Sequence, residues 1–308
     1  MSLFSLIAVF LLEQFKPLDY RSIIGDPLSA WADFIESRFN AGTRANGMAA
    51  WLVAVALPVV LIGLVYGLLY WITPVLAWVF NVLVLYLTMG FRQFSHHYTD
   101  IQIALREGEL ERARGLLRDW QGIAVDGLDS QEIARLSITG ALAASHRHVF
   151  AVLLWFVLLP GPCGAVLYRL AVIVRDRWVA VTNVAEHNDF SLFAQQVFGI
   201  IDWLPLRVTA AAFAIVGDFE DAVYCWRTQP AQWPDRDLAI VLASGAGALG
   251  VSLAGAAIDE GALAEPAELG LGEPADADYM QSAVGLVWRA TVLWMLLLFL
   301  LGLASLAG

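Results

Sequence analysis

The chain has 308 residues, of which 59% are hydrophobic and only 15% are charged, and its formal net charge is −11. Its mean hydropathy is +0.66, which is more apolar surface than a soluble domain of this size can enclose, so we expect lipid to be its solvent. The acidic balance argues against a nucleic-acid-binding protein, which presents a basic face. Cys163 and Cys225 follow no CxxC spacing. We therefore expect two inert thiols, neither a disulfide framework nor a zinc site.

The first quarter of the chain predicts a short helix and then a membrane hairpin. Residues 2–15 are apolar and lack a basic n-region and a cleavage site, so we expect a retained first helix, shorter than the roughly 20 residues of a full span. A short amphipathic helix is predicted around residues 33–38. Residues 49–70 predict a span that Pro58 kinks. After a tight turn, residues 75–89 are expected to return as the second helix of the hairpin.

Residues 92–148 form the longest polar stretch and are rich in arginine. So much positive charge close to the ends of spans favours the cytoplasmic side of the membrane. One helix is predicted over residues 101–120, and a second is expected to begin at Ser130 with Asp129 as its N-cap. Two i,i+3 ion pairs are predicted on the first helix, Glu109–Arg112 and Glu111–Arg114.

Two apolar halves follow, residues 149–159 and residues 165–174, separated by Pro160-Gly161-Pro162. Each half is too short to span the bilayer alone, so they form either one broken span or a re-entrant hairpin. The arginines that follow the second half favour the hairpin, because it places them beside the other arginines.

Three more helices are predicted, over residues 195–216, 238–258 and 284–306. We expect the first to be interrupted around Pro205, where an acid and a base lie in an apolar stretch. The second is built from small residues that let helices approach closely. Its close-packing positions are expected to be Gly245, Gly247, Gly250 and Gly255.

These elements predict an all-α, polytopic integral membrane protein. We expect a single membrane domain over residues 1–308 with a polar, cytoplasmic helical insertion at residues 92–148. The expected location is the bacterial inner (cell) membrane, crossed several times, with the lipid bilayer as the first partner.

A series of short segments carries a resemblance to a known family. They are His97 followed by ALREGELERAR, DSQEIAR at 129–135, Trp155, GAVLYR at 164–169, DWLPLRVTA at 202–210 and GALGVSLAG at 247–255. In this order they resemble the cobalamin-biosynthesis membrane family CobD/CbiB, the adenosylcobinamide-phosphate synthases, and its divergent relative AmpE. For a synthase, the resemblance implies ATP-dependent amide ligation of aminopropanol phosphate to a corrinoid carboxylate with magnesium.

The chain departs from the synthase pattern at its acidic positions. In gapless register the family's Glu-Ser-x-Ala-Glu-Asn helix and the Asp beyond it fall on Thr139, Ala143, Ala144 and Arg147. A later family Asp falls on Arg175, and the Arg-Asp of the family's GRDT segment falls on residues 123–124. Carboxylates hold Mg²⁺ beside phosphate, whereas an arginine binds phosphate but cannot ligate the cation. The departures favour the AmpE-like branch.

Three functions remain open. The leading one is a regulatory or interaction protein without synthase activity, with an envelope protein as partner through residues 92–148. The alternative is a genuine synthase in cobalamin biosynthesis, for which ATP and Mg²⁺ would be cofactors and a corrinoid the substrate. A small-molecule carrier rests only on Asp202 and Arg207.

We assign no catalytic residue and no metal site, and we take eight residues as candidates for ligand binding. They are Arg92, His97, His146, Arg147, His148, Arg175, Asp202 and Arg207.

Each group of candidates also has a structural interpretation. The histidines, with His96, are either a metal or proton site or, as we favour, interfacial side chains, since His146 and His148 at i,i+2 point apart on a helix. The arginines either receive a phosphorylated ligand or anionic lipid, or serve as positive-inside anchors. Asp202 and Arg207 either line a polar cavity or form a structural pair.

Overall fold

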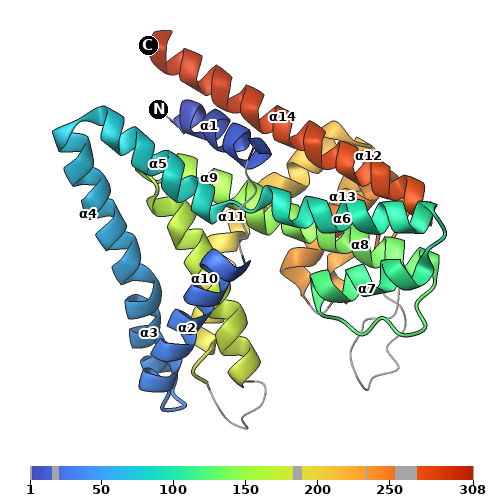
Figure 1. Cartoon of the computed structure of the whole chain (residues 1–308), viewed down its shortest axis with the longest axis horizontal. Coiled ribbons are helices and arrows are strands. Elements are labelled where there is room, and N and C mark those ends of the chain that lie inside the picture. Colours follow the sequence, from blue (N-terminus) through green and yellow to red (C-terminus); the bar gives the residue numbers. More distant parts are fainter. Residues whose placement is uncertain (1, 16–20, 183–188, 234, 254–268, 308) are drawn as a thin grey trace. The chain divides into compact units, whose positions relative to one another are not determined.

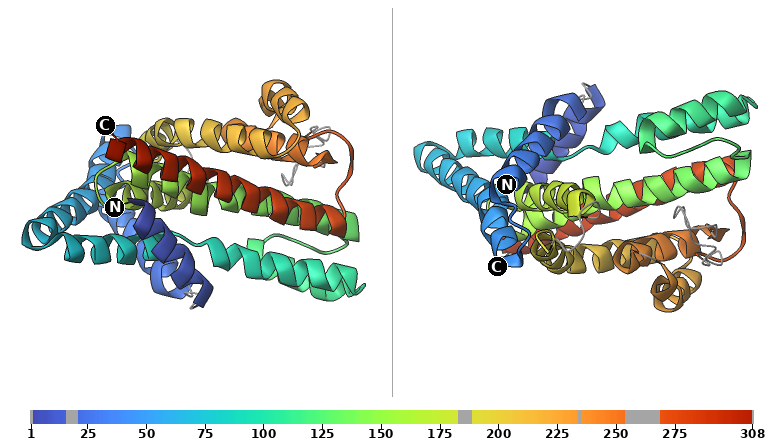
Figure 2. Two further views of the ribbon diagram at one scale, coloured as in Figure 1. Left: turned by 90° about the horizontal axis from the view of Figure 1, so that it is seen from above. Right: turned by 90° about the horizontal axis from the view of Figure 1, so that it is seen from below.

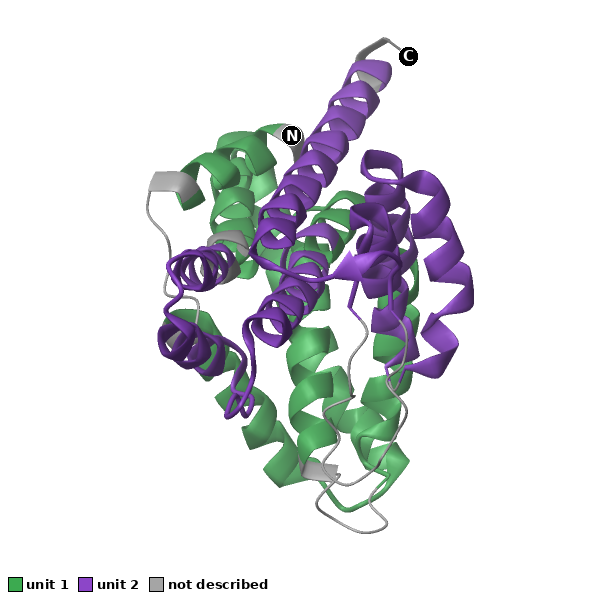
Figure 3. Ribbon diagram, turned by 90° about the vertical axis from the view of Figure 1, so that its right-hand side faces the viewer, with its two compact units in different colours: residues 1–93, 151–204 green, residues 94–150, 205–308 purple. Residues whose placement is uncertain are grey.

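A computed structural model describes residues 2–15, 21–182, 189–233, 235–253 and 269–307 (Figure 1). The described chain is helical apart from one pair of two-residue strands, which confirms the all-α prediction. It divides into two compact units (Figure 3). Unit 1 comprises Met1–Gln93 and Ala151–Leu204, and unit 2 comprises Phe94–Phe150 and Pro205–Gly308. The single domain with an insertion at residues 92–148 stays a prediction.

Unit 1 is built from the N-terminal helices, the hairpin that follows residue 150 and the first part of α11. Its helices are α1 (Ser2–Phe15), α2 (Asp26–Phe39), α3 (Arg44–Trp51), α4 (Leu57–Ile72), α5 (Pro74–Thr88), α9 (Ala151–Leu158), α10 (Cys163–Thr182) and the part of α11 (Leu192–Val216) up to Leu204. π-Helical turns precede α2 and α4, at Arg21–Gly25 and Leu52–Ala56.

The predicted first span and the hairpin are confirmed (Figure 1). Thr73 ends α4 and caps α5, because its side chain accepts a hydrogen bond from the Leu76 N–H. The outward side chains of α4 are large and apolar, with Leu64 and Leu68 exposed and Trp71 85% exposed. Such a surface is stable against hydrocarbon and costly against water.

The irregularity predicted at Pro58 takes the form of the π-helical turn just before it. The Leu57 N–H donates to the Leu52 carbonyl, five residues back. Pro58 has no N–H to give to the Ala54 carbonyl four residues back. The indole N–H of Trp31 on α2 donates to that carbonyl instead, at 3.2 Å. A side chain of α2 thus satisfies the acceptor that the proline leaves open.

The apolar halves around Pro160-Gly161-Pro162 form a hairpin, because α9 packs on α10, and its re-entry into the membrane stays a prediction. A Cβ on Gly164 would lie 1.8 Å from the Trp155 carbonyl oxygen, so the two backbones touch there. The first half is longer than predicted. Its apolar residues continue the preceding helix without a break, so that Ser130–Leu158 is one 29-residue helix.

Unit 2 contains the polar stretch and the C-terminal helices. Its helices are α6 (Phe91–Arg106, from Phe94), α7 (Leu110–Gln121), α8 (Ser130–Ser145), the part of α11 from Pro205, α12 (Phe219–Thr228), α13 (Arg236–Leu249) and α14 (Ala277–Ala307). A π-helical turn, His146–Phe150, follows α8, and a 3₁₀ turn, Pro230–Gln232, follows α12. Strand β1 (Val251–Ser252) pairs in parallel with β2 (Glu273–Pro274). Within this unit α8 and α14 run side by side (Figure 2).

The prediction of one continuous helix over residues 101–120 is wrong, because the helix is interrupted between α6 and α7. Gly108 has φ +76°, a left-handed conformation that favours glycine. Both predicted ion pairs are present, Glu109–Arg112 at 2.8 Å and Glu111–Arg114 at 2.5 Å. Asp129 caps α8 and forms a capping box with Glu132, as the sequence indicated.

The small-residue helix ends earlier than predicted. α13 stops at Leu249, and Gly250 caps it with φ +65° rather than packing closely. Gly245 does pack closely, since a Cβ added there would lie 2.8 Å from Leu142, and one added at Gly247 would meet the Asp221 carbonyl at 2.6 Å. Gly255 and residues 254–258 of the predicted helix lie outside the described residues.

Four helices in the described ranges are long and apolar enough to cross a membrane, so the chain is a multi-pass membrane protein. They are Arg44–Ile72, Ser130–Leu158, Leu192–Val216 and Ala277–Ala304. The interruption expected at Pro205 is wrong, since α11 runs through it. Asp202 and Arg207 are therefore both helical residues.

Replacing Trp31 by Phe should lower stability by about 1–3 kcal/mol, because the Ala54 carbonyl loses its donor. The same substitution should cost less in a Pro58→Ala background, where residue 58 regains an N–H for that carbonyl. A double-mutant cycle on thermal unfolding in detergent measures this coupling. Additive losses would show that the indole bond does not compensate for the proline.

Replacing Gly164 by Ala should lower the thermal midpoint, because the new methyl meets the Trp155 backbone and the α9–α10 hairpin must open. The matched control is Gly67→Ala on α4, where an added Cβ would meet no atom within 4 Å. That variant should keep or raise the midpoint, since Ala favours helix. Equal midpoints for the two variants would contradict the close contact.

Candidate functional site

The His146 side chain is fully buried in unit 2 and bonded to a residue that the sequence had not singled out. Its Nδ1 lies 3.0 Å from the hydroxyl of Thr209 on α11, which is also buried. Next along the π-helical turn, Phe150 packs edge-on to Phe213 at 5.7 Å and stacks with Trp294 at 6.4 Å. A fully buried imidazole with a hydrogen-bond partner is a satisfied core group. The interfacial position that we favoured for the histidines is wrong for His146.

Arg147 follows on the same turn and faces an acid from α13. Its Nη2 lies 3.8 Å from Asp235 Oδ2, and its side chain is 24% exposed. Its Nε is buried and has no hydrogen-bond partner among the described residues. Asp235 also caps α13 by accepting from the Leu238 N–H. An acid directly before a helix was the signal that could have identified Asp235.

The other candidates of unit 2 are half-buried and lie on different elements. His148 is on the π-helical turn, His97 on α6 and Arg207 on α11. The chain around Arg92 forms the start of α6, but its side chain lies outside the described residues.

In unit 1 the buried acid Asp202 is held by a tyrosine. The Tyr168 hydroxyl on α10 donates to Asp202 Oδ1 at 2.9 Å, and Asp202 is only 5% exposed. The Tyr168 ring lies 6.1 Å from that of Phe198, over which the Arg175 guanidinium sits at 5.2 Å. Arg175 also pairs with Asp176 at 2.9 Å. Asp202 belongs to unit 1 and Arg207 to unit 2, so the predicted pair stays a prediction.

The positions that the gapless register assigns to the acids of the synthase pattern hold other groups. On α8, the Thr139 hydroxyl donates to the Arg135 carbonyl at 2.9 Å, and residues 143 and 144 are alanines. No group of three or more His, Cys, Asp or Glu side chains within the described ranges is arranged to hold a metal ion. The carboxylates that a hard cation needs are not gathered in the described part of the chain.

The two cysteines are free, and Cys225 on α12 is buried. Burial first, and then the charge of Asp221, raises the pKa of Cys225 to about 11. Its thiolate is therefore scarce near neutral pH, so this thiol is neither a ready nucleophile nor a ready metal ligand. The burial of Cys225 agrees with the expected inert thiol, and its lack of reactivity stays a prediction.

Four apolar spans define a multi-pass α-helical membrane protein, and comparison with known proteins gives its family. The chain belongs to the family described as CobD/Cbib protein, whose model matches residues 21–287. No solved structure matches the chain.

Curated relatives of the chain include proteins named CobD and a protein named AmpE. The chain is 34% identical over 271 residues to the cobalamin biosynthesis protein CobD of Stutzerimonas stutzeri, covering 87% of each chain. It is 36% identical over 221 residues to that of Chromobacterium violaceum, covering 72% of this chain and 70% of the relative. It is also 25% identical over 231 residues to protein AmpE of Shigella flexneri, covering 73% of this chain and 78% of the relative.

Replacing Tyr168 by Phe should lower stability by about 1–3 kcal/mol, because the buried Asp202 loses a donor. The double variant Tyr168→Phe with Asp202→Leu should recover part of this loss, since neither partner is then left unsatisfied. Thermal unfolding in detergent gives the values, with Tyr70→Phe on exposed α4 as the matched control. A double variant that is the sum of the two single losses would contradict the coupling.

Proposed function

We propose that this chain is a CobD/CbiB-family protein of the bacterial inner membrane that lacks synthase-type amide ligation and acts as a regulatory or interaction protein. The observation that carries the proposal is the set of side chains at the family's acidic positions. They are Thr139, Ala143, Ala144 and Arg147.

Electrostatics supports the loss of magnesium-dependent chemistry. Mg²⁺ beside phosphate is held through carboxylates. Thr139 uses its hydroxyl hydrogen within its own helix. Arg147 brings a positive charge that repels a cation, and its guanidinium forms an ion pair with Asp235, a nearby acid. The local charge is thus arranged for an anion or a protein side chain.

The likeness to protein AmpE, the divergent relative of the synthases, supports the part of the proposal in which synthase-type chemistry is absent. The polar stretch at residues 92–148 is the part that we propose contacts an envelope protein partner. Its helix α7 carries exposed charges in exposed ion pairs, among them Arg112 with Glu109 and Arg118 with Asp126. Exposed pairs of this kind add little stability, which leaves these charges available for a partner of complementary charge.

The alternative is an adenosylcobinamide-phosphate synthase of cobalamin biosynthesis. It is favoured by the 34% identity to a relative named cobalamin biosynthesis protein CobD over 87% of both chains. In that case a corrinoid is the substrate, ATP and Mg²⁺ are required, and residues outside the family's acidic positions supply the cation ligands.

The deciding experiment supplies the purified protein with adenosylcobyric acid, aminopropanol phosphate, ATP and Mg²⁺ and measures the amide product by mass spectrometry. An established adenosylcobinamide-phosphate synthase, assayed in parallel, is the positive control. We expect no product above the protein-free background, because the family's acidic positions here carry no carboxylate to hold the cation.

Product formation that Arg147→Ala or His97→Ala abolishes would overturn the proposal and establish a synthase with a rebuilt site. Gly67→Ala, which changes an open position on α4, is the matched control for nonspecific loss. Product that all three variants retain would also overturn the proposal and would place the chemistry on other residues.

A further inference from the structure

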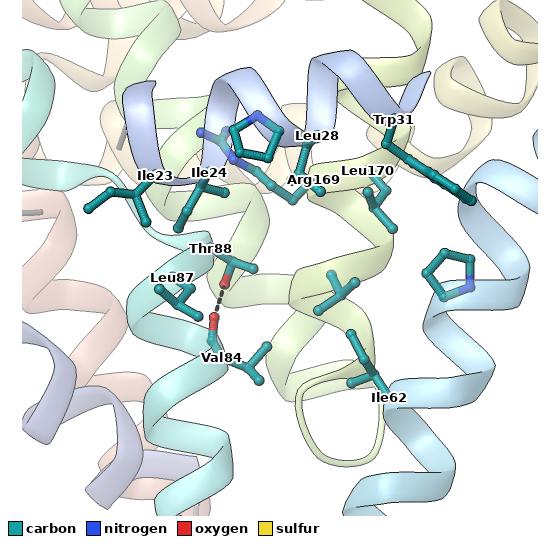
Figure 4. Close-up of a pocket in the computed structure, with 13 residues that line it drawn as sticks. Ile23, Ile24, Leu28, Trp31, Ile62, Val84, Leu87, Thr88, Arg169 and Leu170 are labelled. Carbon is teal, nitrogen blue, oxygen red and sulfur yellow. Dashed lines mark hydrogen bonds between the residues drawn. The ribbon is translucent and has the colours of Figure 1, made fainter. Parts of the chain in front are cut away.

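A cavity of about 450 Å³ lies between the two helices of the α4–α5 hairpin in unit 1. Its walls are completed by α10 and α2, with the π-helical turn Arg21–Gly25 before α2 (Figure 4). Ile62 of α4, Leu87 of α5 and Leu170 of α10 give these walls an apolar surface. The size falls in the range of small-molecule sites, so the cavity has room for a ligand.

Little polar surface faces this cavity, although Thr88 and Arg169 are among its described lining residues. Thr88 is 7% exposed, and its hydroxyl donates within its own helix, to the Val84 carbonyl at 2.9 Å. Arg169 is 3% exposed and already interacts within the chain. Because both polar side chains are buried and have partners, the walls select for a hydrocarbon occupant rather than for a charged one.

The cavity has a buried floor and a rim that reaches the surface. On the floor, Val166 and Leu170 of α10 are 7% and 4% exposed. On the rim, Ile23 of the π-helical turn is 52% exposed. An elongated occupant can therefore rest one end on the floor while its other end extends past Ile23. This shape suits one chain of a larger molecule whose polar part stays outside.

The surroundings of the cavity indicate which hydrocarbon fills it. Water has few polar partners in such a space, and an unfilled apolar cavity is costly because its lining side chains lose packing contacts. The outer faces of α4 and α5 expose large apolar side chains, among them Leu61, Leu64 and Leu83. Since these faces suit a bilayer, the acyl chains of phospholipids are the hydrocarbon present next to the cavity at high concentration.

We propose that the cavity binds one acyl chain of a bilayer phospholipid, whatever the headgroup, with the chain against Ile62 and Leu87 and the head beyond Ile23. The site lies wholly within unit 1 and does not depend on the proposed regulatory function. It makes one lipid a stoichiometric ligand of this chain.

The test strips bilayer lipid with a short-chain detergent, adds back one synthetic lipid at a time and counts retained lipid by native mass spectrometry. The wild-type chain should retain one phosphatidylglycerol and, equally well, one phosphatidylcholine with the same acyl chains, because the head lies outside the walls. Glycerophosphocholine, which has the head without the chains, should not displace either lipid. Retention of phosphatidylglycerol alone, displacement by the free head or no retained lipid would each overturn the proposal.

Two substitutions on α4 then locate the chain. Ile62→Trp fills the cavity and should weaken the retention of both lipids, by about tenfold for every two methylene groups that lose their contact. Leu64→Trp is the matched control, because Leu64 is 65% exposed on the outer face of the same helix, and it should keep wild-type retention. Wild-type retention by Ile62→Trp, or an equal loss in both variants, would overturn the proposal.

Trp31 allows a second measurement that places no larger side chain in the cavity. Its indole lines the cavity, so one equivalent of phosphatidylcholine with brominated acyl chains should quench its fluorescence. Trp31→Phe should therefore lose much of the quenching seen in the wild-type chain. Trp71→Phe, which removes an indole that is 85% exposed, is the matched control and should keep that quenching. Wild-type quenching in Trp31→Phe would overturn the proposal even where Ile62→Trp fails to fold.

Discussion

Satisfaction of backbone hydrogen bonds in lipid is the constraint on which this structure depends. Hydrocarbon offers no partner to a bare carbonyl, so each one must be bonded within the protein. Pro58 removes the donor that Ala54 would use, and the chain responds with a π-helical turn and with the indole of Trp31. That bond fixes α2 against the first span. Trp31 also lines an apolar cavity of unit 1, so the residue that satisfies the Ala54 carbonyl also shapes that cavity.

Two ionisable side chains, the buried Asp202 and the half-buried Arg147, are likewise each held by a partner. Asp202 has a neutral donor, Tyr168, at hydrogen-bonding distance. Arg147 faces Asp235, which also caps a helix. Each arrangement holds one ionisable side chain in place, and neither brings several carboxylates together. A family that relies on clustered carboxylates for a cation can lose that chemistry through a few substitutions while the fold remains, because the helices depend on apolar packing and on their own backbone bonds.

Much of the fold could be predicted from the sequence, because long apolar runs and turn residues report on local structure. The α4–α5 hairpin and the cap at Asp129 were readable in this way. The break at Gly108 was not, since apolar residues lie on both sides of it, at Leu105 and again at Ala113, and only the left-handed glycine reveals the turn. The end of α13 at Gly250 was missed for the same reason.

The candidate site was less predictable. Thr209, Tyr168 and Asp235 became relevant only through partners far away in the sequence. Spacing rules such as i,i+4 see neighbours within one helix and cannot see these contacts. The apolar cavity of unit 1 could not be predicted from the sequence for a related reason, since its walls come from four helices.

The length of the first span has a consequence for the bilayer itself. Arg44–Ile72 contains 29 residues, which at the rise of an α-helix is about 43 Å, against a hydrocarbon thickness of about 30 Å. The surplus is accommodated by tilt or by leaving one end among the headgroups. Its first turn carries Arg44, which bonds Gln196 at 2.6 Å, and so has the polarity of an interfacial segment. A thicker membrane would draw more of that turn into hydrocarbon, so the depth at which Arg44 lies depends on the thickness of the bilayer.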